Sequence, residues 1–146
     1  MQTFLPFPSF TATARVLDSK RLGKQRVECK QLLLGQWKNH PASKMWVGHS
    51  HHLALYGLAI CDEWIFRGCQ DSCRSFMLDR ISVLEDTGPP WWLGWSAFHL
   101  THQSNLIRKF PSHYEELFPG VPGDLPYIWP DDSDRLIVLG AKHSPT

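Results

Sequence analysis

Hydrophobic residues recur at a helical spacing along most of this chain of 146 residues. Apolar positions at i, i+3, i+4 and i+7 predict amphipathic helices rather than strands. The first helix begins near Ser9, near Thr11 or only after Asp18. We favour one long element with an irregularity at Asp18, and Gly35 stands where a left-handed residue usually ends a helix.

Three further helices are expected after Gly35. The first starts at Pro41, with Asn39 or His40 near its cap, and the periodic pattern continues to Arg67 and Gly68. The others run from about Asp71 to Leu84 and from Ser96 to Lys109, where Pro111 stops the helix. The residues expected to face inward are Leu53, Tyr56, Ile60, Trp64, Ile65, Phe76, Ile81 and Leu84.

Proline and glycine dominate the chain from about Phe118, where it reads LFPGVPGDLPYIWPDD. Such a composition predicts irregular structure. Residues 135–140 (RLIVLG) have the composition of a short strand, but nothing else in the sequence offers a partner strand. We therefore predict an all-α fold: a single compact multi-helix domain over residues 1–146 with an irregular Pro/Gly-rich C-terminal segment.

One face of the helix after Asp18 combines a carboxylate with cations and an amide. At about 100° per residue, this face carries Arg21, Lys24, Gln25 and Glu28. A second, apolar stripe carries Leu22, Cys29 and Leu33. The polar face has two interpretations. It is either a solvated surface with ion pairs at i,i+3 and i,i+4, or an acid/base carboxylate inside an anion-binding surface.

Charge is distributed unevenly along the chain, although the net charge is only +1. Residues 1–44 contain eight Lys or Arg against two acids, and the remaining residues contain seven against twelve. A one-sided field of this kind suits a polyanionic partner. The seven tryptophans and eight phenylalanines can serve a core or stack on bases.

Several classes of protein find no support in the sequence. The apolar runs are too short to span a bilayer, and the N-terminus lacks the features of a signal peptide, so we expect a cytoplasmic protein. The four cysteines lack a C-x-x-C pair, so reduced thiols and no metal site are expected, despite His49, His51 and His52. G-x-S-x-G and Walker motifs are absent as well.

Four segments together resemble a known enzyme family. They are RLGKQRVE (21–28), HPASKMWVGH (40–49), EWIFRG (63–68) and NLIRKFPSHY (105–114). In this order they resemble the pyrimidine-dimer DNA glycosylases of the endonuclease V-like family, and RLGKQRVE is the specific part of the match. The chain is similar to a bacterial branch of the family that carries the same LFPG and DLPYIWP tail.

The resemblance implies an all-α enzyme that needs no metal or cofactor. It also implies a nucleophilic N-terminal α-amine and one glutamate on the first long helix, which by position are Met1 and Glu28. Arginine directly precedes this glutamate in the phage member of the family, whereas Val27 does so here. Because Gln2 is large, we expect Met1 to be retained.

The implied reaction agrees with the chemistry of an α-amine. Its pKa of about 7.7–8.0, against about 10.4 for lysine, leaves far more free amine at pH 7. The amine can attack the sugar C1′, displace the base and leave an imine, while Glu28 moves protons. The resemblance implies that the partner is double-stranded DNA that contains a lesion or an abasic site, and we expect a monomer to bind it. The expected DNA-binding residues are Arg15, Lys20, Arg21, Lys24, Gln25, Arg26, Lys30, His49, Asn105, Arg108 and Lys109.

Two other functions stay open at this point. A nucleic-acid-binding protein with the same fold would bind DNA without cleaving it. A glycosylase for a different modified base would share the imine chemistry, because selectivity among bases depends on the shape of the pocket.

Overall fold

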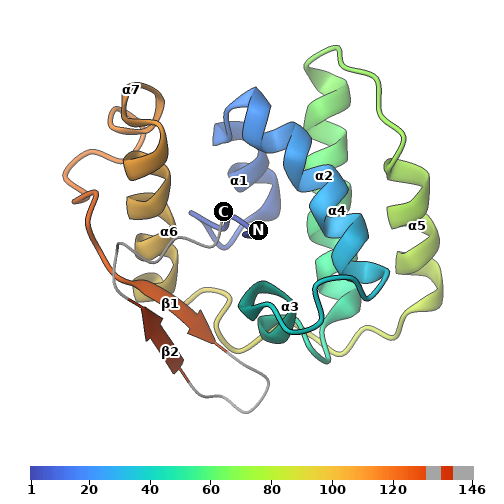
Figure 1. Ribbon diagram of the computed structural model, residues 1–146. Coiled ribbons are helices and arrows are strands. Elements are labelled where there is room, and N and C mark those ends of the chain that lie inside the picture. Colours follow the sequence, from blue (N-terminus) through green and yellow to red (C-terminus); the bar gives the residue numbers. More distant parts are fainter. Residues whose placement is uncertain (131–135, 140–146) are drawn as a thin grey trace.

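The computed structural model describes residues 1–130 and 136–139, which form seven helices and one two-stranded sheet (Figure 1). The helices are α1 (Phe10–Val16), α2 (Ser19–Leu33), α3 (Pro41–Met45), α4 (Ser50–Phe66), α5 (Arg74–Val83), α6 (Ser96–Lys109) and α7 (Pro111–Tyr114). The strands are β1 (Tyr127–Pro130) and β2 (Leu136–Leu139). The prediction of an all-α fold is confirmed, with this small sheet as an addition to it.

The irregularity expected at Asp18 is present, but it is a complete break, so the expectation of one long first helix is wrong and the chain forms α1 and α2 instead. Leu17 takes an extended conformation, and Asp18 caps α2 by accepting a hydrogen bond from the Arg21 N–H at 3.3 Å. The Asp18 N–H donates to the Tyr114 hydroxyl at 2.9 Å. This contact from a distant segment uses a backbone donor that a continuous helix would have bonded internally.

The end of α2 follows the prediction. Gly35 has a φ of 81° and donates to the Leu32 carbonyl, while the Gln36 N–H reaches the Gln31 carbonyl at 3.0 Å. These two bonds form a Schellman motif, which satisfies carbonyl groups that the helix itself leaves unpaired.

The region from Pro41 to Gly68 forms two helices. The His40 side chain caps α3 by accepting from the Ala42 N–H at 3.0 Å. Gly48, with a φ of 81°, then turns the chain before α4 begins. Arg67 and Gly68 end α4, as predicted.

Core packing centres on α4, which contacts α1, α2 and α5. Gly57 of α4 admits the buried Met77 of α5, since a Cβ at Gly57 would lie 2.5 Å from the Met77 sulfur. Met77 is therefore the buried residue of α5, whereas the predicted Phe76, Ile81 and Leu84 are only half-buried. Ile65 of α4, also expected to face inward, is 44% exposed.

The C-terminal segment contains β1, a partner for the short strand predicted at residues 135–140. β1 pairs antiparallel with β2, with Tyr127 opposite Leu139 and Pro130 opposite Leu136. β1 also contacts α3 and α6. Among residues 1–130 and 136–139, no helix is long and apolar enough to cross a membrane.

Candidate active site

The first six residues are buried, and Figure 1 places the N-terminus between α2 and α6. Side chains of α6 hold the backbone of this segment. The Leu5 N–H donates to His102 Nδ1 at 3.0 Å, and the Leu5 carbonyl lies 2.7 Å from His99 Nδ1. Gln103 Nε2 donates to the Pro6 carbonyl at 2.8 Å. The chain end is thus built into the protein interior.

Gln25 of α2 holds the same segment from the opposite side. Its Oε1 accepts from the Phe4 N–H at 3.0 Å and from the Tyr56 hydroxyl at 2.8 Å. Its Nε2 donates to the Gln2 carbonyl at 2.6 Å and to Glu28 Oε1 at 3.3 Å. One buried amide nitrogen therefore contacts both the N-terminal backbone and the candidate acid/base carboxylate.

Met1 and Glu28 influence each other electrostatically. Burial lowers the pKa of the Met1 α-amine, Glu28 opposes this effect, and Lys24 and Lys109 add to it. Burial also raises the pKa of Glu28, against the opposing effects of the Met1 amine, Lys24 and the hydrogen bond from Gln25. A less basic amine beside a more basic carboxylate is a pair suited to nucleophilic and acid/base chemistry.

Two cavities meet at Glu28. The smaller one has a volume of about 180 Å³ and is lined by Phe4, Lys20, Arg21, Lys24, Gln25, Glu28 and Lys109. The larger one has a volume of about 580 Å³ and is lined by Met1, Ser19, Lys20, Gly23, Lys24, Arg26, Val27, Glu28, Gln31, Trp37 and Trp64. The polar face expected on α2 is therefore the wall of a site. Met1 and Glu28 both line its larger cavity.

Four cations surround the smaller cavity: Lys20, Arg21, Lys24 and Lys109. Three come from α2, and Lys109 comes from the end of α6. Burial lowers the pKa of Lys109, and the nearby Arg21, Arg108 and Lys24 lower it further. This concentration of positive charge favours an anion close to Glu28.

The first 77 residues match the family described as pyrimidine dimer DNA glycosylase. The chain belongs to this family. Neither the curated proteins nor the solved structures gave a significant match. The matched part contains Met1, Glu28 and all of α2, whereas α6 lies beyond it. Membership confirms the resemblance noted in the sequence, and the family's substrate is DNA.

Two predicted DNA-binding cations of this glycosylase lie against α4 and α5. Arg26 pairs with the buried carboxylate of Asp71 at 2.5 Å and stacks over Trp64 at 4.7 Å. Lys30 lies 5.3 Å over the ring of Phe76. These contacts give both side chains a structural role, although Arg26 also lines the larger cavity.

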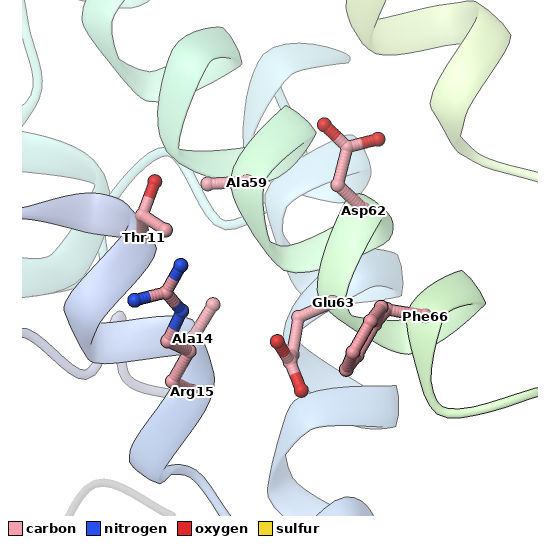
Figure 2. Close-up of a pocket in the computed structure, with 7 residues that line it drawn as sticks. All are labelled: Thr11, Ala14, Arg15, Ala59, Asp62, Glu63 and Phe66. Carbon is pink, nitrogen blue, oxygen red and sulfur yellow. The ribbon is translucent and has the colours of Figure 1, made fainter.

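Arg15 lines a separate cavity of about 310 Å³ between α1 and α4 (Figure 2). The figure shows its guanidinium alongside α1 near Thr11, and Asp62, Glu63 and Phe66 on α4. Arg74 pairs with Asp62 at 2.6 Å, and Arg67 pairs with Glu63 at 2.8 Å. The structure does not bring Arg15 into the cavities at Glu28.

Three further predicted contacts lie elsewhere. Asn105 is fully buried and accepts hydrogen bonds from the Tyr127 hydroxyl and from Arg108. Arg108 also donates to the Gly123 carbonyl at 2.8 Å. His49 precedes α4, with its Nδ1 3.3 Å from the Gly88 carbonyl. Like Gln25, these three residues contact other parts of the protein. Gln25 lines the smaller cavity, but His49, Asn105 and Arg108 line neither cavity.

Two tryptophans that the sequence pattern did not indicate as site residues line the larger cavity. Trp37 follows the end of α2, has a φ of 64° and is 49% exposed, and its indole donates to Gln31 at 3.1 Å. A positive φ at a bulky residue is uncommon in proteins and frequent at functional sites. Trp64 had been assigned to the core. Trp64 lines the larger cavity. It also packs closely against Gly23, where a Cβ would lie 2.9 Å from the Trp64 ring.

Proposed function

We propose that this chain is a DNA glycosylase with abasic-site lyase activity, and that the Met1 α-amine is its nucleophile. The nitrogen lone pair attacks C1′ of the damaged nucleotide, and the C1′–base bond breaks with its electron pair leaving on the base. Opening of the sugar at the C1′–O4′ bond then produces an imine between Met1 and C1′. Removal of a C2′ proton expels the 3′ phosphate and cleaves the strand.

The observation that carries this proposal is the shared position of Met1 and Glu28. Both line one cavity. Gln25 Nε2 donates one hydrogen bond to the Gln2 carbonyl and another to the Glu28 carboxylate. The lowered pKa of the amine increases the unprotonated fraction that can attack carbon. The raised pKa of Glu28 suits a group that takes up and returns protons on the sugar.

The cations beside Glu28 would bind the phosphates that flank the damaged nucleotide. Lys20 and Lys24 are exposed, and Arg21 and Lys109 are half-buried at the same cavity. Phosphate contacts fix the position of a protein on DNA and carry no sequence information. This agrees with an enzyme that finds damage in any sequence context.

The larger cavity would receive an extruded nucleotide. Its volume of about 580 Å³ and its two indole rings suit an unstacked base. Exposed aromatic rings stabilise such a base by stacking, which contributes about 1–3 kcal/mol. Damaged bases leave the helix at the lowest cost, since they stack and pair poorly.

Reductive trapping tests the nucleophile. The untagged protein is incubated with a duplex that contains one abasic site, reduced with borohydride and mapped by peptide mass spectrometry. We expect the adduct on the N-terminal peptide, and acetylation of the α-amine should abolish it because an amide cannot form an imine. Lys24→Arg serves as the matched control, which should still trap.

The outcomes separate three functions. An adduct on a lysine would refute the assignment to Met1. Binding without any adduct would identify a non-catalytic DNA-binding protein. A panel of duplexes, each with one lesion, then decides whether pyrimidine dimers or another modified base is released.

A further inference from the structure

Three side chains of the kind that bind metals converge where α4 begins. His51 and His52 lie in its first turn, and Asp86 lies in the connection between α5 and α6. Their ligand atoms all lie within 4.8 Å of one another. None of the three lines a cavity at Glu28. The cluster is therefore separate from the candidate active site.

The distances within the cluster do not fit hydrogen bonds. Nδ1 of His51 and Nδ1 of His52 each lie 3.7 Å from the same oxygen, Oδ1 of Asp86. Hydrogen bonds between nitrogen and oxygen are about 2.7–3.2 Å long. Both Nδ1 atoms are shielded from solvent and have no hydrogen-bond partner within residues 1–130 and 136–139. Burying two nitrogen atoms without a hydrogen-bond partner costs free energy, so their position beside one carboxylate calls for an explanation.

The loop that carries Asp86 is held in place by its own hydrogen bonds. Asp86 Oδ1 accepts from the Gly88 N–H at 2.9 Å, and the Thr87 hydroxyl donates to the Gly48 carbonyl at 2.6 Å. His52 packs edge-on against the ring of Phe10, with the ring centres 6.5 Å apart. The carboxylate and at least one imidazole are thus oriented before any ligand arrives.

We propose that His51, His52 and Asp86 bind one divalent transition-metal ion, with zinc as the best match. Ligands about 2.0–2.2 Å from a tetrahedral zinc ion lie about 3.4 Å apart. The two distances of 3.7 Å between the histidine Nδ1 atoms and Asp86 Oδ1 are close to this spacing. Imidazole and carboxylate ligands suit zinc.

The ion would fasten the connection between α5 and α6 to the first turn of α4. Two imidazoles and one carboxylate leave at least one coordination position for water. The His51–Asp86 link joins residues 35 positions apart in the sequence, so metal binding would stabilise the folded chain over the unfolded one.

Titration with zinc chloride tests the site. The untagged full-length protein is treated with a chelator, dialysed and titrated by calorimetry, and cobalt(II) is added in parallel to record visible absorption. We expect one zinc ion per chain, a higher Tm with zinc and cobalt absorption bands of a four-coordinate site. Asp86→Asn should weaken zinc binding by about 10-fold or more and remove the rise in Tm.

Asp79→Asn is the matched control, since the Asp79 side chain is 62% exposed and that of Asp86 is 61% exposed. Because Asp86 is exposed, its replacement should leave the protein folded, which circular dichroism verifies. The proposal fails if the wild type binds no zinc. It also fails if Asp86→Asn binds zinc as tightly as the wild type, because the ion would then lie elsewhere.

Discussion

Replacing Gln25 by leucine tests whether the site needs the hydrogen bonds that position Met1 and Glu28, because both residues stay in the protein. Leucine has nearly the size of glutamine but no polar atoms. The substitution leaves Met1 and Glu28 unchanged and removes the amide that bonds the Gln2 carbonyl, the Phe4 N–H and the Glu28 carboxylate. The N-terminal segment then loses the hydrogen bonds through which Gln25 holds it against α2.

The expected loss of stability follows from the groups left unpaired. The Phe4 N–H and the Gln2 carbonyl belong to buried residues, and each would lose its hydrogen bond to Gln25. A buried group without a partner costs about 1–3 kcal/mol, so the two together cost about 2–6 kcal/mol. For a domain of this size, this corresponds to a Tm lower by about 6–20 °C.

The Gln25→Leu variant should react slowly even where it is fully folded. Small displacements of a reacting group from its productive position can lower a rate by about 100-fold. The assay is single-turnover borohydride trapping on abasic-site DNA, at a temperature where circular dichroism shows the variant fully folded. The trapping rate should fall by about 100-fold, while the affinity for DNA changes little.

Gln103→Leu is the matched control. It removes one hydrogen bond, to the Pro6 carbonyl, and should cost about 1–3 kcal/mol without slowing trapping. Leu5, which lies closer to the amine, keeps its bonds to α6. If folded Gln25→Leu traps DNA at the wild-type rate, the attachment to α2 does not position the amine and our interpretation of the site is wrong.

Four further predictions concern the same surface. Glu28→Gln should lower strand cleavage by about 100-fold or more. It should also raise the Tm at neutral pH. Folding raises the pKa of Glu28, so the wild-type protein becomes less stable as the pH rises through that pKa, and glutamine carries no charge that would have this effect. The trapping rate should rise with pH and level off below the pKa of about 7.7–8.0 typical of an α-amine, since burial lowers that of Met1. Lys24→Ala should weaken binding to every duplex and make the slope of log K against log salt concentration shallower by about one unit. An affinity of the wild type that does not change with salt would argue against phosphate contacts. Arg26→Ala should destabilise the fold by about 3 kcal/mol, measured by urea unfolding, because Asp71 would lose its buried partner.

Local patterns were sufficient to predict several elements. The spacing of Arg21, Lys24 and Glu28 predicted one face of α2, and that face lines the smaller cavity. Glycines at positions 35 and 68 end α2 and α4 as expected, since few other residues tolerate a positive φ. These predictions succeeded because they depend on residues close together in the sequence.

Contacts between distant segments decided the rest. Tyr114 bonds Asp18, 96 residues earlier, and so stabilises a complete break between α1 and α2 where the sequence predicted only an irregularity. Gln25, expected at the DNA, lines the smaller cavity and also contacts the N-terminal backbone and Tyr56. A polar face looks the same in sequence whether solvent or another segment covers it.

The sequence alone thus determined the helical class of this glycosylase, the composition of its basic face and, through family resemblance, Met1 and Glu28 as the residues to examine. Only the tertiary structure buried residues 1–6, brought Lys109 from α6 to Glu28 and placed Trp37 and Trp64 on the cavity wall. Helical periodicity is a property of neighbouring residues. The surroundings of an amine or a carboxylate depend on which remote segments pack against it, and those segments set the pKa values of Met1 and Glu28.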